Sequence, residues 1–196
     1  MKTTTLRQQK ALETKNRLID SALRVFSRKG FDSSTTKDIA KEAGVTDGLI
    51  YHYFASKEEL LWAVVDKHSL NKNLQTAALE LNGDDSLESL MTCYFNRMLD
   101  MLHEKESLIV MFFGEAQRNP QIRERLVSII EEGIHPLYFL LNNKGVRKGD
   151  DVLLAIRNVQ TTIVMYFLLF DRMDNDKDGR DRYIEVTVRQ FLRSLG

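Results

Sequence analysis

Apolar residues recur at helical spacing along almost the whole chain, and this pattern limits its possible folds more than any other feature. One stretch near the start shows the i, i+3, i+4, i+7 order of a single helix face: Ile19, Ala22, Leu23 and Phe26. The chain has only two prolines, and no run alternates apolar and polar residues long enough to predict a strand. We therefore expect an all-α fold of about nine helices.

Glycine, proline and capping residues mark the expected helix ends. The first helix should end at Gly30. A second, short helix should start within Thr35–Asp38 and end at Gly44, and a third, capped by Thr46, should run to about Tyr53. Ser56 and Glu59 have capping-box spacing, and the helix they begin should run to about Leu81. Five more helices are expected over 85–103, 105–117, 120–143, 150–172 and 181–195.

Composition excludes several classes of protein. Of 196 residues, 43% are hydrophobic, and the 28 basic residues balance the 28 acidic ones, which argues against a disordered chain. The longest apolar run, Ile163–Phe170, has eight residues, whereas a membrane span needs roughly 18. The N-terminus lacks an apolar signal segment, and the single Cys93 excludes an intrachain disulfide. These features predict a cytoplasmic protein without membrane contact.

Basic residues gather at the N-terminus. The first 30 residues contain eight bases and only two acids. The bases are Lys2, Arg7, Lys10, Lys15, Arg17, Arg24, Arg28 and Lys29. Such an end suits a polyanionic partner, although a solvated helix face explains it equally well.

Residues 35–54, TTKDIAKEAGVTDGLIYHYF, have the pattern of a helix–turn–helix. Gly44 supplies a tight turn that needs a positive φ, and Val45 fills the corner between the two short helices. Their shared apolar seam consists of Ile39, Ala40, Ile50 and Phe54. This is the geometry that lays a second helix in the major groove of DNA.

The same stretch resembles the DNA-binding domain of the TetR family of bacterial transcriptional regulators, over roughly residues 12–72. The matching residues keep the family's spacing without a gap: Gly30-Phe31, Thr35-Thr36, Ile39-Ala40, Ala43-Gly44-Val45-Thr46, Gly48, Tyr51, Tyr53-Phe54, Lys57-Glu58 and Leu60. The resemblance implies three parts. They are a basic arm (1–11), a DNA-binding domain (12–72) and a C-terminal helical bundle (73–196) for effector binding and dimerisation.

Given this resemblance, two groups of residues are expected to contact DNA. Phosphate contacts are expected from hydroxyl, imidazole and ammonium groups: Thr36, Lys37, Tyr51, His52 and Lys57. Groove contacts are expected from the start of the second short helix: Thr46, Asp47, Gly48 and Leu49. Thr46 is alternatively only a helix cap, and Tyr51 only a packing residue. That helix contains no Arg, Lys, Asn or Gln, so specificity should come from few contacts, water or DNA shape.

The C-terminal half suggests a dimer and an effector pocket. From Val152 to Phe170 only Arg157 is charged, so that helix must be covered on nearly every side, partly by a second subunit. Family members typically dimerise through their last two long helices and bind an effector in this domain. An apolar effector would suit the Met- and Phe-rich segments, although the same residues are also ordinary core. The expected lining is Phe95, Met98, Leu102, Phe112, Phe113, Tyr138, Met165 and Tyr166.

One motif suggests calcium. Asp174, Asp176, Asp178 and Glu185 have the spacing of an EF-hand loop. Asp181, however, stands at a position that is normally apolar, and no second hand follows. We therefore expect no metal site and keep this loop as a weak candidate.

Motifs of enzymes are missing from the sequence. It has no P-loop, no G-x-S-x-G and no H-E-x-x-H, and His103 and His135 lack partners at ligand spacing. We expect no enzyme and no cofactor. The expected function is a homodimeric repressor on a double-stranded, inverted-repeat operator, released by an apolar small molecule. The alternative is a DNA-binding or architectural protein that responds to no effector.

Overall fold

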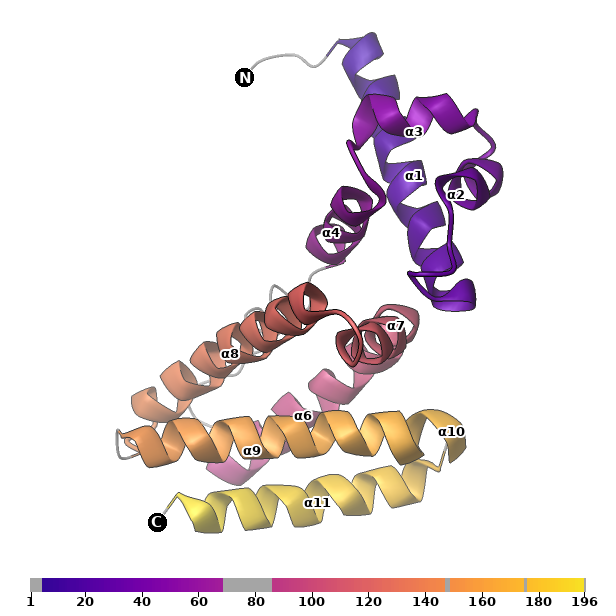
Figure 1. The fold of residues 1–196 in the computed structure, drawn as a ribbon. Helices are drawn as coiled ribbons and strands as arrows, with labels where there is room; N and C mark the ends of the chain where they lie inside the picture. The colour runs from indigo at the N-terminus through magenta and orange to yellow at the C-terminus, as the bar shows by residue number, and fades with distance from the viewer. Residues whose placement is uncertain (1–4, 69–85, 147–148, 175, 196) are drawn as a thin grey trace. The chain divides into compact units, whose positions relative to one another are not determined.

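The computed structural model describes residues 5–68, 86–146, 149–174 and 176–195. These residues form helices joined by short turns, with no strand among them, as the sequence predicts. They divide into two compact units (Figure 1). The N-terminal unit contains the residues up to His68 together with Ser107–Pro120, and the C-terminal unit contains the residues from 86 to Glu106 and from Gln121 onward.

The N-terminal unit contains α1 (Leu6–Lys29), α2 (Thr36–Ala43), α3 (Asp47–Tyr53), α4 (Lys57–Lys67) and all but the first residue of α7 (Glu106–Ala116). Helix α1 packs against α2 and α4, and α2 packs against α3. The largest fully buried side chains of this unit include Phe26, Ile39, Ile50, Phe54 and Leu60. Their burial fixes the angle between α2 and α3, because close-packed side chains leave little room for sliding.

Helix caps explain where α1 and α2 begin. The Thr5 hydroxyl accepts from the Gln8 backbone N–H, and Gln8 Oε1 accepts from the Thr5 backbone N–H. This capping box starts α1 at Leu6, so residues 6–11 of the expected basic arm belong to the first helix. Thr35 and Asp38 form the corresponding box at the start of α2.

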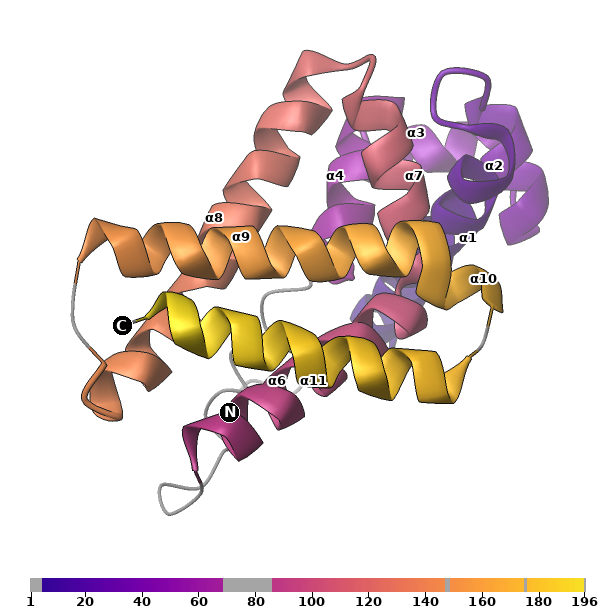
Figure 2. The same cartoon turned by 90° about the horizontal axis from the view of Figure 1, so that it is seen from below.

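The C-terminal unit contains α6 (Leu87–Glu104), all but the first residue of α8 (Pro120–Asn143), α9 (Asp150–Tyr166), the π-helix η1 (Phe167–Asp171), α10 (Arg172–Asp174) and α11 (Lys177–Ser194). Helices α9 and α11 lie side by side, and α6 packs against both (Figures 1 and 2). A buried amide joins three helices of this unit, because Gln160 Nε2 donates to the Gly133 carbonyl (3.0 Å) and to Tyr94 Oη (3.4 Å). Burial raises the pKa of Tyr94 to about 12.

Two helix ends differ from the sequence-based expectation. Helix α4 ends at Lys67, whereas we expected it to run to Leu81, and the remainder of that span lies outside the described residues. Helix α11 begins at Lys177 rather than 181, because Asp176 Oδ1 accepts from the Gly179 N–H and caps the extra turn.

The segment Asp150–Asp171 is helical over 22 residues with a mean hydropathy of 1.6, so by length and composition it meets the requirement for a membrane span. It packs against α6 and α11 within the C-terminal unit, but only one third of its most apolar window is buried there. Leu154 and Leu169 are 50% and 59% exposed. An apolar helix face is therefore left uncovered in the single chain.

Candidate nucleic-acid interface

A left-handed glycine makes the turn of the helix–turn–helix. Gly44 ends α2 at φ 66° and ψ 38°, a conformation that costs little only for a residue without a side chain. The Val45 N–H then donates to the Ala40 carbonyl (3.0 Å), and the Leu49 N–H to the Thr46 carbonyl (3.0 Å), which starts α3. The turn found here is the one that the sequence predicts.

Two expected phosphate contacts come together in space. Thr36 Oγ1 lies 3.2 Å from Tyr51 Oη, which joins the first turn of α2 to the middle of α3. Lys37 and His52 follow these residues in the chain and are exposed. We call Thr36, Lys37, Tyr51 and His52 the α2–α3 polar surface. Thr36 and Lys37 stand at the N-terminus of α2, whereas Tyr51 and His52 lie further along α3. Their hydroxyl, ammonium and imidazole groups are all suited to phosphate oxygens.

The start of α3 is open on its outer side. Thr46 and Gly48 are exposed, and Leu49 is half-buried. A Cβ placed on Gly48 would meet no atom within 4 Å, so the α3 backbone is accessible there. Asp47 differs, because its Oδ1 is buried without a hydrogen-bond partner among the described residues. That atom is turned away from solvent and is not available to a base.

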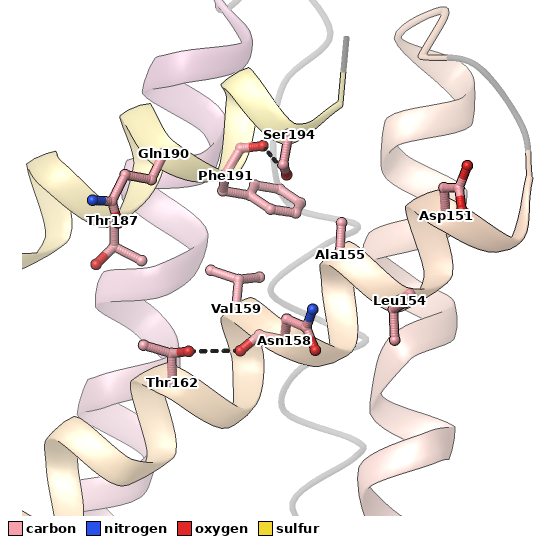
Figure 3. Close-up of a pocket in the computed structure, with 10 residues that line it drawn as sticks. All are labelled: Asp151, Leu154, Ala155, Asn158, Val159, Thr162, Thr187, Gln190, Phe191 and Ser194. Carbon is pink, nitrogen blue, oxygen red and sulfur yellow. Dashed lines mark hydrogen bonds between the residues drawn. The ribbon is translucent and has the colours of Figure 1, made fainter.

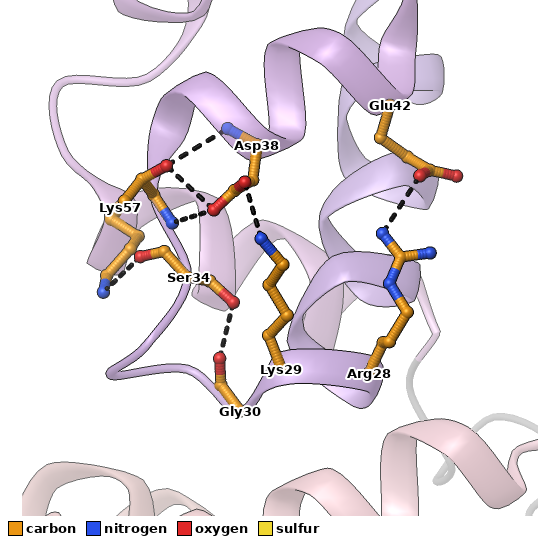
Figure 4. A network of polar contacts seen from close by, with 8 residues as sticks. Arg28, Lys29, Gly30, Ser34, Asp38, Glu42 and Lys57 are labelled. Carbon is orange, nitrogen blue, oxygen red and sulfur yellow. Dashed lines mark hydrogen bonds and ion pairs between the residues drawn. The ribbon is translucent and has the colours of Figure 1, made fainter.

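Lys57 has a different environment from the one expected. Its ammonium donates to the carbonyls of Phe31 (2.8 Å) and Asp32 (3.3 Å), and it lies 4.4 Å from the centroid of the Phe31 ring. It also donates to the Ser34 carbonyl at 3.0 Å (Figure 4). An ammonium has three N–H donors, so these carbonyls use all of them. The expected phosphate contact of Lys57 stays a prediction, and in the single chain the ammonium already bonds to these carbonyls.

Three of the N-terminal bases are also paired inside this unit. Arg24 contacts Glu42 at 2.9 Å. Arg28 contacts the same carboxylate at 3.3 Å, and Lys29 contacts Asp38 at 2.6 Å (Figure 4). The bond from Lys29, followed by those from Thr35, lowers the pKa of Asp38 to about 2. The bonds from Arg24 and Arg28 lower the pKa of Glu42.

The bases of α1 outside these ion pairs lie towards its N-terminus and are exposed: Arg7, Lys10, Lys15 and Arg17. Of these, Lys15 lies 5.5 Å from the centroid of the Phe54 ring. The basic residues of the chain's start are therefore divided between bases paired to acids of the same unit and bases at the N-terminal end of α1 outside those pairs.

The eight residues expected to line an effector pocket differ in burial and do not all belong to the same structural unit. Phe95, Met98 and Leu102 are buried on α6, whereas Met165 is exposed. Tyr138 and Tyr166 are half-buried, and Tyr166 stacks on Tyr183 with ring centroids 3.6 Å apart. Phe112 and Phe113 lie on the α7 segment that belongs to the N-terminal unit.

Two cavities of the C-terminal unit have other linings. A groove of about 430 Å³ runs between α9 and α11 (Figure 3). Its lining residues are Asp151, Leu154, Ala155, Asn158, Val159, Thr162, Thr187, Gln190, Phe191 and Ser194. A second, polar cavity of about 370 Å³ lies between α6 and the start of α11. There His103 Nε2 lies 2.6 Å from the buried Asp171 Oδ2, a pairing of residues 68 apart that no sequence spacing indicates.

The calcium candidate does not form a loop. Asp178 and Glu185 lie within α11, Asp176 caps that helix, and Glu185 pairs with Arg189. An EF-hand instead needs a continuous twelve-residue loop that wraps around the ion. No group of three or more His, Cys, Asp or Glu side chains able to hold a metal occurs within the described residues.

Known proteins share both the local pattern and the whole fold. Residues 18–64 match the family model described as bacterial regulatory proteins, tetR family. The chain is also 36% identical over 147 residues to the HTH-type transcriptional regulator TtgW of Pseudomonas putida, covering 75% of this chain and 94% of that protein. This chain belongs to the TetR family.

Further comparisons extend over almost the whole chain. The HTH-type transcriptional regulator SrpR, also of Pseudomonas putida, is 28% identical over 194 residues, covering 94% of this chain and 86% of that protein. The solved structure of the transcriptional regulator FadR of Bacillus subtilis, in complex with stearoyl-CoA, has a TM-score of 0.68 at 22% identity and covers 92% of this chain and 96% of that one. This TetR-family protein is accordingly a DNA-binding transcriptional regulator.

Proposed function

We propose that this regulator is a cytoplasmic repressor that binds an inverted-repeat operator as a homodimer and leaves it when an apolar small molecule binds. The observation that supports DNA contact most directly is the α2–α3 polar surface. Thr36 and Tyr51 come from different helices, yet their oxygens lie 3.2 Å apart on an exposed face. One phosphate group can bridge two hydroxyls at this separation.

In this proposal α3 enters the major groove, and the polar surface fixes it to the flanking phosphates. Gly48 lets the backbone approach the base edges, and Leu49 contacts a thymine methyl group. Thr46 adds a polar contact at the same end of α3. Since α3 carries no Arg, Lys, Asn or Gln, much of the sequence preference comes from DNA shape. The exposed bases of α1, such as Arg7 and Lys10, add sequence-independent attraction.

The dimer forms through α9 and α11. The groove between these helices and the exposed Leu154, Met165 and Val186 give them an apolar outer face. Pairing α9 and α11 with their copies forms a four-helix bundle that covers this face. We place the DNA-binding domain at residues 12–72 and the dimerisation and effector domain at 73–196. The α7 segment is an addition to this division, because residues 107–120 group with the N-terminal unit.

The effector is an apolar molecule bound in the C-terminal domain. The buried Phe95, Met98 and Leu102 line one side of α6, and Met and aromatic side chains adapt to apolar ligands. FadR of Bacillus subtilis, which shares the fold, was solved with stearoyl-CoA. A long-chain acyl thioester is therefore the first compound to test.

The proposal is tested by selecting fragments of the source genome with the purified protein and measuring affinity with and without stearoyl-CoA. We expect a fragment with two inverted half-sites, bound about 10³-fold or more tightly than scrambled DNA, and released by the acyl thioester. Equal affinity for selected and scrambled DNA would instead favour an architectural protein. Selective binding that no apolar compound weakens would overturn the effector part alone.

A further inference from the structure

The loop between α1 and α2, residues 30–35, is held by side chains from two other helices. Glu115 of α7 places Oε1 2.7 Å from the Phe31 backbone nitrogen and accepts its N–H. Lys57 of α4 donates to three carbonyls of the same loop, including that of Phe31. The backbone N–H and C=O of Phe31 are thus both bonded to charged groups, which make stronger hydrogen bonds than neutral ones.

The environment of Glu115 is unusual for a glutamate. The residue is only 6% exposed, and Oε2 has no hydrogen-bond partner among the described residues. A buried carboxylate with one unsatisfied oxygen destabilises a fold relative to an apolar side chain of the same size. The backbone also approaches it closely, since a Cβ on Gly30 would lie 3.2 Å from Oε1. A group that costs stability in this way needs a role other than stabilisation.

The position of α7 in the chain suggests that role. Its first residue, Glu106, belongs to the C-terminal unit and accepts from Arg172 Nη1 at 3.2 Å. From Ser107 onward the helix belongs to the N-terminal unit, where the Ser27 hydroxyl donates to the Ser107 carbonyl (3.0 Å). Glu106 and Glu115 are separated by about 14 Å of helix rise. One short helix therefore carries polar contacts in each unit, one near each of its ends.

We propose that Glu115 is a positioning residue that couples α7 to the helix–turn–helix by holding the Phe31 backbone. The loop leads directly into Thr35, the cap of α2, and into Thr36 of the α2–α3 polar surface. A displacement of α7 is passed through the Glu115–Phe31 bond to this surface and changes its fit to DNA. That an effector acts through this contact rests on the proposed function. That Glu115 positions the loop does not.

Two substitutions separate the carboxylate's hydrogen bond from its charge. Glu115→Gln keeps an oxygen acceptor for the Phe31 N–H, and Glu115→Leu removes the acceptor at similar size. Gln117→Ala is the control, because Gln117 is exposed two positions further along and bonds to the Phe113 carbonyl rather than to the loop. Each variant is measured for unfolding by denaturant, for amide hydrogen exchange at Phe31, and for affinity towards the DNA fragment selected with the parent protein, with and without stearoyl-CoA.

We expect Glu115→Leu to unfold at a denaturant concentration equal to or above that of the parent. It should nevertheless lose protection at the Phe31 amide and about 10-fold or more in DNA affinity. The ratio of affinities with and without stearoyl-CoA should fall towards one. Glu115→Gln should keep the protection of the Phe31 amide and most of the DNA affinity of the parent. The control Gln117→Ala should match the parent in both measurements.

Unchanged Phe31 exchange and unchanged DNA affinity in Glu115→Leu would overturn the proposal. Loss of stability with unchanged DNA affinity would also overturn it, because it would show a purely structural contact. If stearoyl-CoA does not release even the parent protein, the effector assignment fails separately. The exchange and affinity measurements then still decide whether Glu115 positions the loop.

Discussion

Single residues of the helix–turn–helix region differ in whether their polar groups face solvent or the protein. Thr36 and Tyr51 present oxygens to solvent, whereas Lys57 directs its ammonium into a neighbouring loop and Asp47 buries one oxygen. The sequence identifies all four positions, but it cannot distinguish these roles. Each role depends on a group 15 or more residues away, or on burial, and neither follows from spacing along the chain.

Gly48→Ala separates DNA contact from folding. Beyond the neighbouring residues and backbone of its own helix, no atom lies within 4 Å of the added Cβ, and alanine favours a helix over glycine by about 1 kcal/mol. The variant should therefore melt at the same or a higher temperature, yet bind the operator about 10-fold more weakly if DNA approaches this backbone. Gly114→Ala is the matched control, since its added Cβ also meets no atom. If Gly48→Ala binds the operator as tightly as the parent does, the proposal that α3 lies in the major groove is wrong.

Lys57→Met tests the inward role of the lysine. The ammonium's bonds to carbonyls are lost while the stem still covers the Phe31 ring, so the free energy of unfolding should fall by about 1–3 kcal/mol. The slope of log affinity against log salt should stay at the parent value, because no phosphate contact is removed. Denaturant titration and binding at several salt concentrations measure the two quantities. If the salt slope of Lys57→Met is lower than that of the parent by about one and its stability is unchanged, Lys57 contacts phosphate instead.

At the scale of helices, caps and glycines determine where the elements begin and end. Gly30, Gly44 and the Ser56 cap were readable from sequence because each needs only local chemistry. Two features are not predicted by the sequence: the early start of α11 at Lys177, capped by Asp176, and the π-helical turn at Phe167–Asp171. Asp171 at the end of the π-helix contacts His103, which is 68 residues away and which no helical period indicates. Glu115 was missed for a similar reason, although an acid within the apolar stretch SLIVMFFGEA was a visible signal.

The cap of α2 predicts a pH dependence. Bonds from Lys29 and Thr35 hold the pKa of Asp38 at about 2, below its ordinary value of 3.8. A depressed pKa means that the ionised carboxylate favours the folded state above pH 3.8, and this contribution is lost as the pH falls towards 2. Asp38→Asn should therefore melt below the parent at pH 7, and the two should converge near pH 2. Asp32→Asn, in the exposed loop, serves as control. A constant difference down to pH 2 would contradict the assigned bonds.

For the whole molecule, the main feature that the packing of a single chain does not explain is the exposed apolar face of α9 and α11. The sequence showed that the segment is apolar, but only the structure shows which of its residues stay outside the core. Leu154 is half exposed within the single chain. Its exposure agrees with a second copy covering this face, which remains a prediction.

Leu154→Glu should prevent dimerisation without unfolding the chain. The side chain is 50% exposed in the monomer, so a carboxylate there stays hydrated, but burying it in an interface costs several kcal/mol. Sedimentation should give the mass of one chain, and operator affinity should fall because one helix–turn–helix reads only a half-site. Val127→Glu changes an exposed apolar residue of α8 and should leave the dimer intact. A dimeric Leu154→Glu protein would place the interface elsewhere.

Our proposal for the whole molecule is that the helix–turn–helix binds DNA with sequence preference and that the α2–α3 polar surface supplies its phosphate contacts. The most direct measurement compares affinity for the selected operator and for scrambled DNA at two salt concentrations, in the parent and in a Thr36→Ala, Tyr51→Phe double variant. We expect the parent to prefer the operator and to lose affinity as salt rises. The double variant should bind both DNAs more weakly by a similar factor, because phosphate contacts position without specifying. Equal affinity of the parent for the two DNAs, or an unaffected double variant, would contradict this account.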